Sequence, residues 1–407
     1  VLPIEADSQD TALTIFNTLN DRGKPLSDSD IFKAKIYNHL QGKTAKKEFV
    51  ENWQDLEQGC SEAHINIQDL FYYYMFYLRA LDGDRDTTTP GLRKYFSAQK
   101  FERLFLPHLL GDISHSLRLW TVVYTRESQT DAWSQNLEIR KLLDILVDFP
   151  NEFWKYPVNT YYLEYSEQDH FESNFKVFLE QLVAGLIGRF IVQPGVNAVK
   201  NSILILNVAT INNKQPSFHP DIDRDELIQK MELPHYRIVK CLLKFLAYQN
   251  GHQTTLLPEH WEIDHILPKK WQQNYLFGYK RDEVEEVIEH IGNKIPLEKK
   301  LNISAANNYF GEKKIRYRES KIAIARELGS STEENWVIED IKSRDKRICD
   351  SVVAFIGKHI DSFEDGLSDA DRQLANEWKN LSANEYLRLS EAMKLKYNQL
   401  SEAGKFK

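Results

Sequence analysis

Four polar residues in the last third of the chain have the types and the spacing for hydrolytic chemistry. Asp264 and His265 are adjacent, Asn293 follows Gly292, and Asn302 lies nine residues after Asn293. A hard divalent cation prefers oxygen ligands, which Asp264 and Asn302 could provide. His265, with an ordinary pKa of about 6.5, could take a proton from a water molecule that attacks a phosphodiester. The set predicts a metal-assisted phosphodiester hydrolase.

Short strands and a helical insert are expected around these residues. The segment HWEIDHILP (260–268) alternates apolar and polar residues like a strand, and Pro268 ends it. A charged stretch at 281–290 has helical spacing, and GNKIPLE (292–298) indicates a second strand. A helix is expected over 305–329.

Strand geometry limits which of these residues can share a site. Neighbours in a regular strand point to opposite faces, so Asp264 and His265 meet in one site only where the strand ends or distorts. Glu262 lies two residues before Asp264, on the same expected face, and is a candidate additional ligand. Asn302 could instead cap a helix, and Asn293 could shape a turn. His265 alone could be structural, but the ordered set favours catalysis.

Most of the chain before this region has the 3.6-residue period of helices. Ser8 is expected to cap a first helix, and Ser27 with Asp30 resembles a capping box that opens a second one. The aromatic runs at 71–77 and 153–165 could stack on nucleobases, but aromatics at helical spacing are usually core, and we expect them there. The predicted fold class is therefore mainly α.

The composition is that of a globular protein. The 407 residues carry 52 Lys and Arg against 60 Asp and Glu, a net charge of −8, and 42% of them are apolar. These values exclude intrinsic disorder and collagen-like fibres, and the length suggests about two or three domains. The mild acidity argues against a general nucleic-acid coat but allows a local basic site.

Cysteine usage and hydropathy indicate the compartment. Cys60, Cys241 and Cys349 lie far apart, so the sequence has no CxxC pair for a structural zinc and no disulfide framework. No apolar stretch reaches the length of about 20 residues that a membrane span needs. The chain starts at Val1 without a leader, and we expect a cytoplasmic protein cut from a longer chain.

Residues 290–321 form a basic region in this acidic chain, with eight Lys or Arg against three Glu, a net charge of +5. Lys294, Lys313, Lys314 and Arg316 in this region are candidates for binding DNA phosphate beside the proposed site. A charged helix face with i,i+4 pairs is the alternative. Such phosphate contacts position a DNA backbone and carry no sequence information.

The segments EIDHILP (262–268), IGNKIPLEKKLN (291–302) and SAANNYFGEKKIRYRES (304–320) together resemble the HNH, or His-Me finger, nuclease domain in the C-terminal half of GmrSD-like type IV restriction proteins. The DH pair, the GN-containing strand and the Asn at plus nine are also similar to the HNH domain of RNA-guided effector nucleases. The resemblance implies a helical body with an embedded small ββα-metal nuclease unit.

The resemblance also implies a role for each candidate. Asp264 and Asn302 would hold one Mg2+ or Mn2+ ion, His265 would be the general base, and Asn293 would hold the histidine-bearing loop by hydrogen bonds. Lys313, in an F-x-x-K pattern, would contact phosphate. Many HNH proteins have His as the last metal ligand, and Asn302 stands in that place here, but an amide oxygen still suits a hard cation.

A second resemblance lies near the start of the chain. Residues 12–40 resemble the closing segment of the N-terminal ParB-like domain of the same proteins, which is credited with nucleotide hydrolysis and with sensing modified DNA. We expect 1–45 to be the closing helices of that sensor, 46–235 a helical middle domain, 236–362 the HNH nuclease domain and 363–407 a C-terminal helical tail. The sensor's D-G-Q-x-R segment is expected upstream, and a nucleotide would act only through that domain.

The function expected from the residues and the resemblance is a divalent-metal-dependent DNA endonuclease, the effector part of a modification-dependent restriction and phage-defence protein. Its partners would be double-stranded, modified phage DNA and the N-terminal sensor domain, with no membrane. The alternative is a non-catalytic DNA-binding or docking module on a degenerate HNH scaffold. A third interpretation is a helical assembly protein that docks the sensor through 1–45 and the tail.

Overall fold

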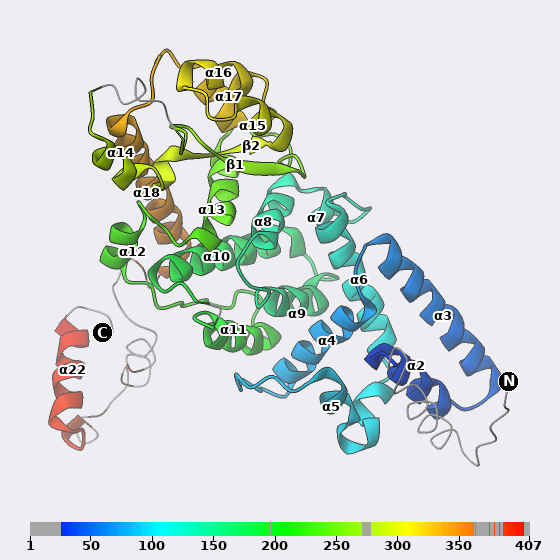
Figure 1. Cartoon of the computed structure of the whole chain (residues 1–407). Helices are drawn as coiled ribbons and strands as arrows, with labels where there is room; N and C mark the ends of the chain where they lie inside the picture. The colour runs from blue at the N-terminus through cyan, green and yellow to red at the C-terminus, as the bar shows by residue number, and fades with distance from the viewer. Residues whose placement is uncertain are drawn as a thin grey trace.

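The structure, a computed structural model, describes residues 26–195, 197–270, 278–361 and 386–402, together with Phe363, Leu374, Trp378 and Ser382. Most of the described residues are helical, and the strands among them form one two-stranded antiparallel sheet (Figure 1). The predicted mainly α fold class is confirmed. The helix expected after Ser8 lies outside the described residues, and so does most of the tail before residue 386.

The helices that precede the sheet make up the helical body. Their bounds are α2 (Asp28–His39), α3 (Lys43–Glu62), α4 (Ile67–Leu81), α5 (Leu92–Ser97), the 3-10 helix η2 (Ala98–Phe105), α6 (Leu109–Thr125), α7 (Ala132–Gln135), α8 (Leu137–Val147), α9 (Lys155–Tyr165), α10 (Phe171–Val192), α11 (Lys200–Asn212), α12 (Arg224–Lys230) and α13 (Tyr236–Gln249). The first of these begins as predicted, because the Ser27 hydroxyl accepts from the Asp30 N–H at 3.2 Å and the Asp30 carboxylate accepts from the Ser27 N–H at 3.0 Å.

The aromatic run of α4 lies in the core. Phe71, Tyr73, Tyr74 and Phe76 are all buried, and the ring of Phe76 stacks on Tyr156 of α9 with 3.6 Å between the ring centroids. Stacked and edge-on aromatic pairs add to the stabilisation that burial alone provides. The prediction that these residues belong to the core is confirmed.

The elements from the sheet onward are shorter. Their bounds are β1 (Trp261–His265), α14 (Arg281–Val287), the 3-10 helix η4 (Ile291–Asn293), β2 (Lys294–Glu298), α15 (Lys299–Ala305), α16 (Phe310–Arg318), α17 (Ala323–Gly329), α18 (Ile338–His359) and α22 (Glu391–Glu402). Both predicted strands and the helical insert are confirmed. The single helix expected over 305–329 is wrong, because Ala306 has a φ of 46° that ends α15, and two separate helices follow.

Two helices join the sheet to the helical body. Helix α13 contacts β2 as well as α8 and α10, and α18 contacts η4 and α10 (Figure 1). Gly188 allows α10 to approach its neighbours closely, since a Cβ there would lie 2.6 Å from Ile222 and 3.1 Å from Ile356. One apolar core therefore runs from the helical body to the sheet. The domain boundaries predicted from the sequence stay predictions.

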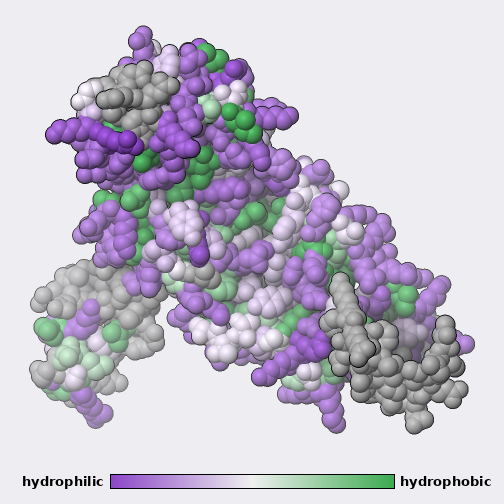
Figure 2. All heavy atoms as spheres, viewed as in Figure 1, coloured by the Kyte–Doolittle hydropathy of each residue, from purple (hydrophilic) through white to green (hydrophobic). Residues whose placement is uncertain are grey.

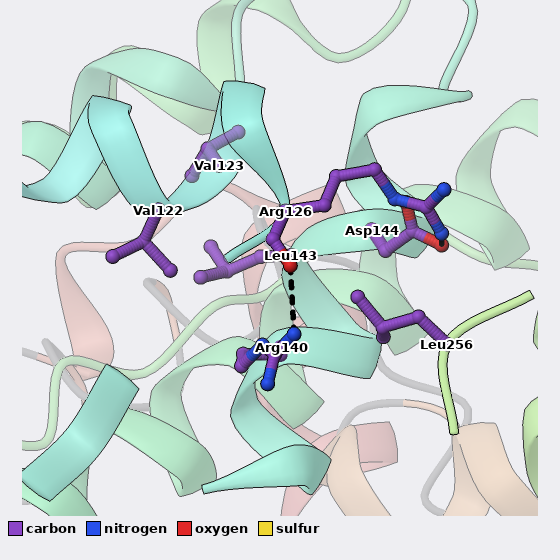
Figure 3. A pocket seen from close by; sticks show the side chains of 7 residues that line it. All are labelled: Val122, Val123, Arg126, Arg140, Leu143, Asp144 and Leu256. Atoms are coloured by element: carbon purple, nitrogen blue, oxygen red, sulfur yellow. Dashed lines mark hydrogen bonds and ion pairs between the residues drawn. The ribbon is translucent and has the colours of Figure 1, made fainter. Parts of the chain in front are cut away.

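Asp144 of α8 holds the segment that leads into β1. Its carboxylate lies 3.2 Å from Nε of Arg126 and accepts a hydrogen bond from the Tyr248 hydroxyl. Both partners also bind the backbone of Leu257. Arg126 donates to the Leu257 carbonyl at 2.7 Å, and the Tyr248 hydroxyl accepts from the Leu257 N–H at 2.9 Å. Figure 3 shows the Arg126 guanidinium beside Asp144, with Arg140 donating to the Arg126 carbonyl. The cavity here, about 10 Å³, has room for about one water molecule, so this cluster is a structural joint.

The surface in view is mostly hydrophilic, and its apolar residues form small, separate groups (Figure 2). None of the described helices is long and apolar enough to cross a lipid bilayer. Cys60, Cys241 and Cys349 are free thiols, the first two of them buried.

Candidate nuclease site

Strands β1 and β2 position the residues that the sequence singles out. The strands pair antiparallel, with Asp264 opposite Ile295 and His265 opposite Lys294, and α15 packs on both of them. Side chains alternate along a strand, so Glu262 and Asp264 share one face of β1 while His265 belongs to the other. The regular pairing continues as far as His265, where β1 ends.

The carboxylate of Asp264 is enclosed by α16. Lys313 Nζ donates to Asp264 Oδ1 at 2.7 Å and to the backbone carbonyl of His265 at 2.6 Å. The hydroxyl of Tyr317 donates to the other carboxylate oxygen. Asp264 is 5% exposed, Lys313 1% and Tyr317 0%. Burial raises the pKa of Asp264 and lowers the pKa of Lys313, while their mutual attraction opposes both shifts.

His265 faces Glu289 in the segment after α14. Its Nε2 atom lies 3.3 Å from Glu289 Oε2, and Glu289 also forms ion pairs with Lys269 and, at 3.0 Å, with Lys294. Burial lowers the pKa of His265 to about 4, although Glu289 favours the protonated ring. Burial alone would raise the pKa of Glu289, but the hydrogen bonds from the two lysines hold it at about 2. At pH 7 the imidazole is therefore neutral and Glu289 is ionised.

Asn293, at the end of η4, fastens the segment that follows β1. Its Oδ1 accepts the Leu267 N–H at 2.8 Å, and its Nδ2 donates to the carbonyls of Leu267 and Ile288, each at 2.9 Å. The N–H of Ile266 donates to the Asn293 carbonyl at 2.8 Å. Asn293 is completely buried. Through these bonds, Asn293 connects the end of η4 to the segment that follows His265.

Asn302 lies inside α15, so the alternative that it caps a helix is wrong. Its Nδ2 atom donates to Glu262 Oε2 at 2.9 Å, and the other oxygen of Glu262 lies 3.7 Å from Lys299. Within the described part of the chain, the Asn302 side-chain oxygen accepts no hydrogen bond. This amide oxygen is therefore open to a ligand on the face of β1 that carries Glu262.

The donor set fits a hard cation in its chemistry. The carboxylates of Asp264 and Glu262 and the amide oxygen of Asn302 are the ligand types that Mg2+ and Mn2+ prefer. No group of three His, Cys, Asp or Glu side chains among the described residues could hold a metal ion, so an ion here would also need the Asn302 oxygen and oxygens from water or phosphate. The ammonium of Lys313 beside Asp264 opposes such binding.

The region that holds these residues is similar to a known family. Residues 220–351 match the family described as GmrSD restriction endonucleases, C-terminal domain. The chain contains the C-terminal domain of a GmrSD-like restriction protein. A restriction endonuclease family implies a nuclease role and DNA as the substrate, and the matched region includes β1, β2 and α15 to α17. No curated protein matches the chain.

The GmrSD C-terminal domain holds most of its predicted phosphate ligands internally. Lys294 Nζ donates to the carbonyl of Glu289 at 2.6 Å, and Lys314 Nζ donates to two backbone carbonyls at 2.6 and 2.7 Å. With Lys313 on Asp264, all three ammonium groups already donate to acceptors within the protein. Arg316 differs, because its side chain is 41% exposed and contacts Glu319 at the surface.

Three residues of the GmrSD C-terminal domain bear on the site without having been found from the sequence. Tyr317 follows Lys313 by four residues in α16, so helical spacing was a signal that both face Asp264. Glu289 lies near the end of the charged insert, where its sequence context is that of an ordinary solvated residue. The third is Asp345 of α18, which accepts the Gly292 N–H at 2.6 Å across 53 residues of sequence, and no local pattern marks it.

Proposed function

We propose that this GmrSD C-terminal domain is a divalent-metal-dependent DNA endonuclease of the HNH type, the effector part of a modification-dependent restriction protein. One observation supports the proposal above the others. Asp264 and His265 end β1, Asn293 holds the segment that follows them, and the open amide oxygen of Asn302 lies on α15, which packs against β1. Modified phage DNA and an N-terminal sensor domain that hydrolyses nucleotide are the proposed partners.

His265 would act as the general base. Its neutral form dominates at pH 7, since burial lowers its pKa to about 4. With the proton on Nε2, that atom donates to Glu289, and Nδ1 keeps the lone pair that accepts a proton from the attacking water. Glu289 is then a positioning residue that orients the ring and stabilises the imidazolium that forms.

Asp264 and Asn302 would hold the Mg2+ or Mn2+ ion, with Glu262 as an additional ligand. When bound, the ion would stabilise the negative charge that builds on the phosphate. Arg316 is the predicted phosphate contact that already faces solvent. The products would carry 5′-phosphate and 3′-hydroxyl ends, as the resemblance implies.

Cleavage of supercoiled plasmid in EDTA, Mg2+ or Mn2+ tests the proposal. We expect metal-dependent nicking by the wild-type chain and a loss of at least about 100-fold in His265→Ala, the lower end of what a general base contributes. His260→Ala is the matched control, because His260 is exposed just before β1 and its bond to the Lys299 N–H uses the backbone. Circular dichroism checks that both variants fold. Unchanged cleavage by His265→Ala would overturn the assignment.

A non-catalytic DNA-binding module is the second candidate, and the Lys313–Asp264 pair is the observation that favours it. If this candidate is correct, a gel-shift assay should show DNA binding, and the chain should not cleave plasmid with either Mg2+ or Mn2+. Addition of the sensor domain, nucleotide and modified DNA separates the two candidates. Restored cleavage means a gated nuclease, and binding without cleavage means a module.

A further inference from the structure

Lys313 occupies the place on Asp264 that a metal ion would need. Its ammonium lies 2.7 Å from Oδ1, and the Tyr317 hydroxyl takes the other oxygen, so each carboxylate oxygen already has a hydrogen-bond donor. The ammonium is almost completely enclosed and has a second acceptor, the His265 carbonyl, at 2.6 Å. Lys313 is therefore an integral, buried part of the site.

A divalent ion and this ammonium exclude each other. An ion bound to Asp264 would lie about 2.0 to 2.6 Å from a carboxylate oxygen, within a few ångströms of Lys313 Nζ in its present position. Like charges at this separation repel strongly where water is excluded. The carboxylate, in turn, needs a positive partner, because an unpaired charge is costly to bury.

We propose that Lys313 is a resident counter-cation that holds Asp264 in the metal-free domain and leaves this carboxylate when a divalent ion binds. This inference rests on the proposed function, in which Asp264 is a metal ligand. The exchange keeps the buried carboxylate neutralised in both states. It also releases the ammonium of α16 beside the site, where it becomes available to a DNA phosphate.

Mn2+ binding to Lys313→Met tests the exchange without any need for cleavage. Methionine keeps most of the length of the side chain and removes the competing charge, so we expect Mn2+ to bind at least about tenfold more tightly than to the wild type. Free Mn2+ is counted by electron paramagnetic resonance during a titration. Lys314→Met is the matched control, since this neighbouring buried lysine donates to two backbone carbonyls and lies over the Phe310 ring. The Mn2+ affinity of this variant should equal that of the wild type.

Thermal unfolding gives the second measurement. In EDTA, Lys313→Met should melt below the wild type, because Asp264 loses its cation, and Mn2+ should raise the melting temperature of the variant more than that of the wild type. If the variant is unfolded in EDTA, recovery of its fold as Mn2+ is added supports the exchange, and failure to recover overturns it.

These measurements distinguish a failure of the proposed exchange from a failure of the proposed nuclease function. Mn2+ affinity that is unchanged or lower in Lys313→Met, with plasmid cleavage intact in the wild type, overturns the exchange alone. Tighter Mn2+ binding in the variant supports the exchange even where the plasmid is not cut. Asp264→Asn added to Lys313→Met should remove the gain in affinity, and a gain that persists in this double variant overturns the site.

Discussion

Oδ1 of Asp345 accepts a hydrogen bond of 2.6 Å from the backbone N–H of Gly292. Asp345 lies on α18 and is 1% exposed, and its other oxygen lies 2.8 Å from Nδ1 of His290. The neighbouring Arg344 donates to the carbonyls of Gly292 and Lys294 at 2.8 and 2.6 Å. Helix α18 thus clamps the turn that presents Asn293 to the end of β1.

Removing the clamp should destabilise the protein. Asp345→Ala leaves the Gly292 N–H buried without an acceptor, so we expect the free energy of unfolding to fall by about 2 to 4 kcal/mol. Urea unfolding measures the change. Asp350→Ala, an exposed position on the same helix, should cost less than about 0.5 kcal/mol. Equal effects of the two substitutions would contradict the clamp.

The same turn should not accept a side chain. A Cβ at Gly292 would lie 2.3 Å from the Ile341 carbonyl oxygen and 2.6 Å from Asp345 Oδ1. Gly292→Ala must push α18 away, and we expect it to lower the free energy of unfolding by about 2 kcal/mol or more. At Gly251 the corresponding space is open, so Gly251→Ala should be neutral or stabilise by up to about 1 kcal/mol. Denaturation of the two variants side by side checks the contrast.

Asn293→Asp keeps the shape of the side chain and changes its hydrogen bonds. The two N–H donations to the Leu267 and Ile288 carbonyls would be replaced by repulsion between oxygen atoms. We expect a loss of about 2 to 3 kcal/mol in unfolding free energy, with a fall in plasmid cleavage because the loop after His265 is released. Asn308→Asp, at an exposed position after α15, controls for the added charge. A fully stable and active Asn293→Asp would refute the fastening role.

Acid should destabilise the fold through His265. Its pKa is about 4 in the folded protein against an ordinary value of 6.5, so between these values the unfolded chain binds a proton that the folded protein does not. The free energy of unfolding therefore falls as the pH is lowered from 6.5 to 4. The contribution of this group is at most about 3 kcal/mol.

Urea unfolding in EDTA across that pH range measures the slope. His265→Gln has no titrating ring at this position, and its unfolding free energy should vary less with pH. Parallel pH profiles for the wild type and the variant would show that other groups cause the acid effect.

Local patterns were enough to predict much of this fold. The alternation of 260–268 predicted the first strand, GNKIPLE at 292–298 predicted the second, and the three-residue spacing of Ser27 and Asp30 predicted the start of α2. Each of these signals depends on neighbours within one element. The break after α15 was missed because Ala306, a good helix former, adopts a positive φ that its residue type does not indicate.

The interior of the site could not be predicted in the same way. A basic run normally indicates a solvated surface, but Lys313 is buried because its acceptor, Asp264, lies 49 residues earlier in the chain. The Asp345–Gly292 bond likewise joins residues 53 apart. Such contacts depend on how α16 and α18 pack against the sheet, and this packing cannot be predicted from composition and residue spacing.

The joint at Asp144 has a consequence for how the molecule opens. Arg126 and Tyr248 tie α6, α8 and α13 to Leu257, a few residues before β1. We therefore expect the region matched from residue 220 onward to unfold together with the helical body. The amide protons of β1 and α8 should therefore exchange with solvent through the same opening event. Their opening free energies should be equal and should fall with the same slope as denaturant is added.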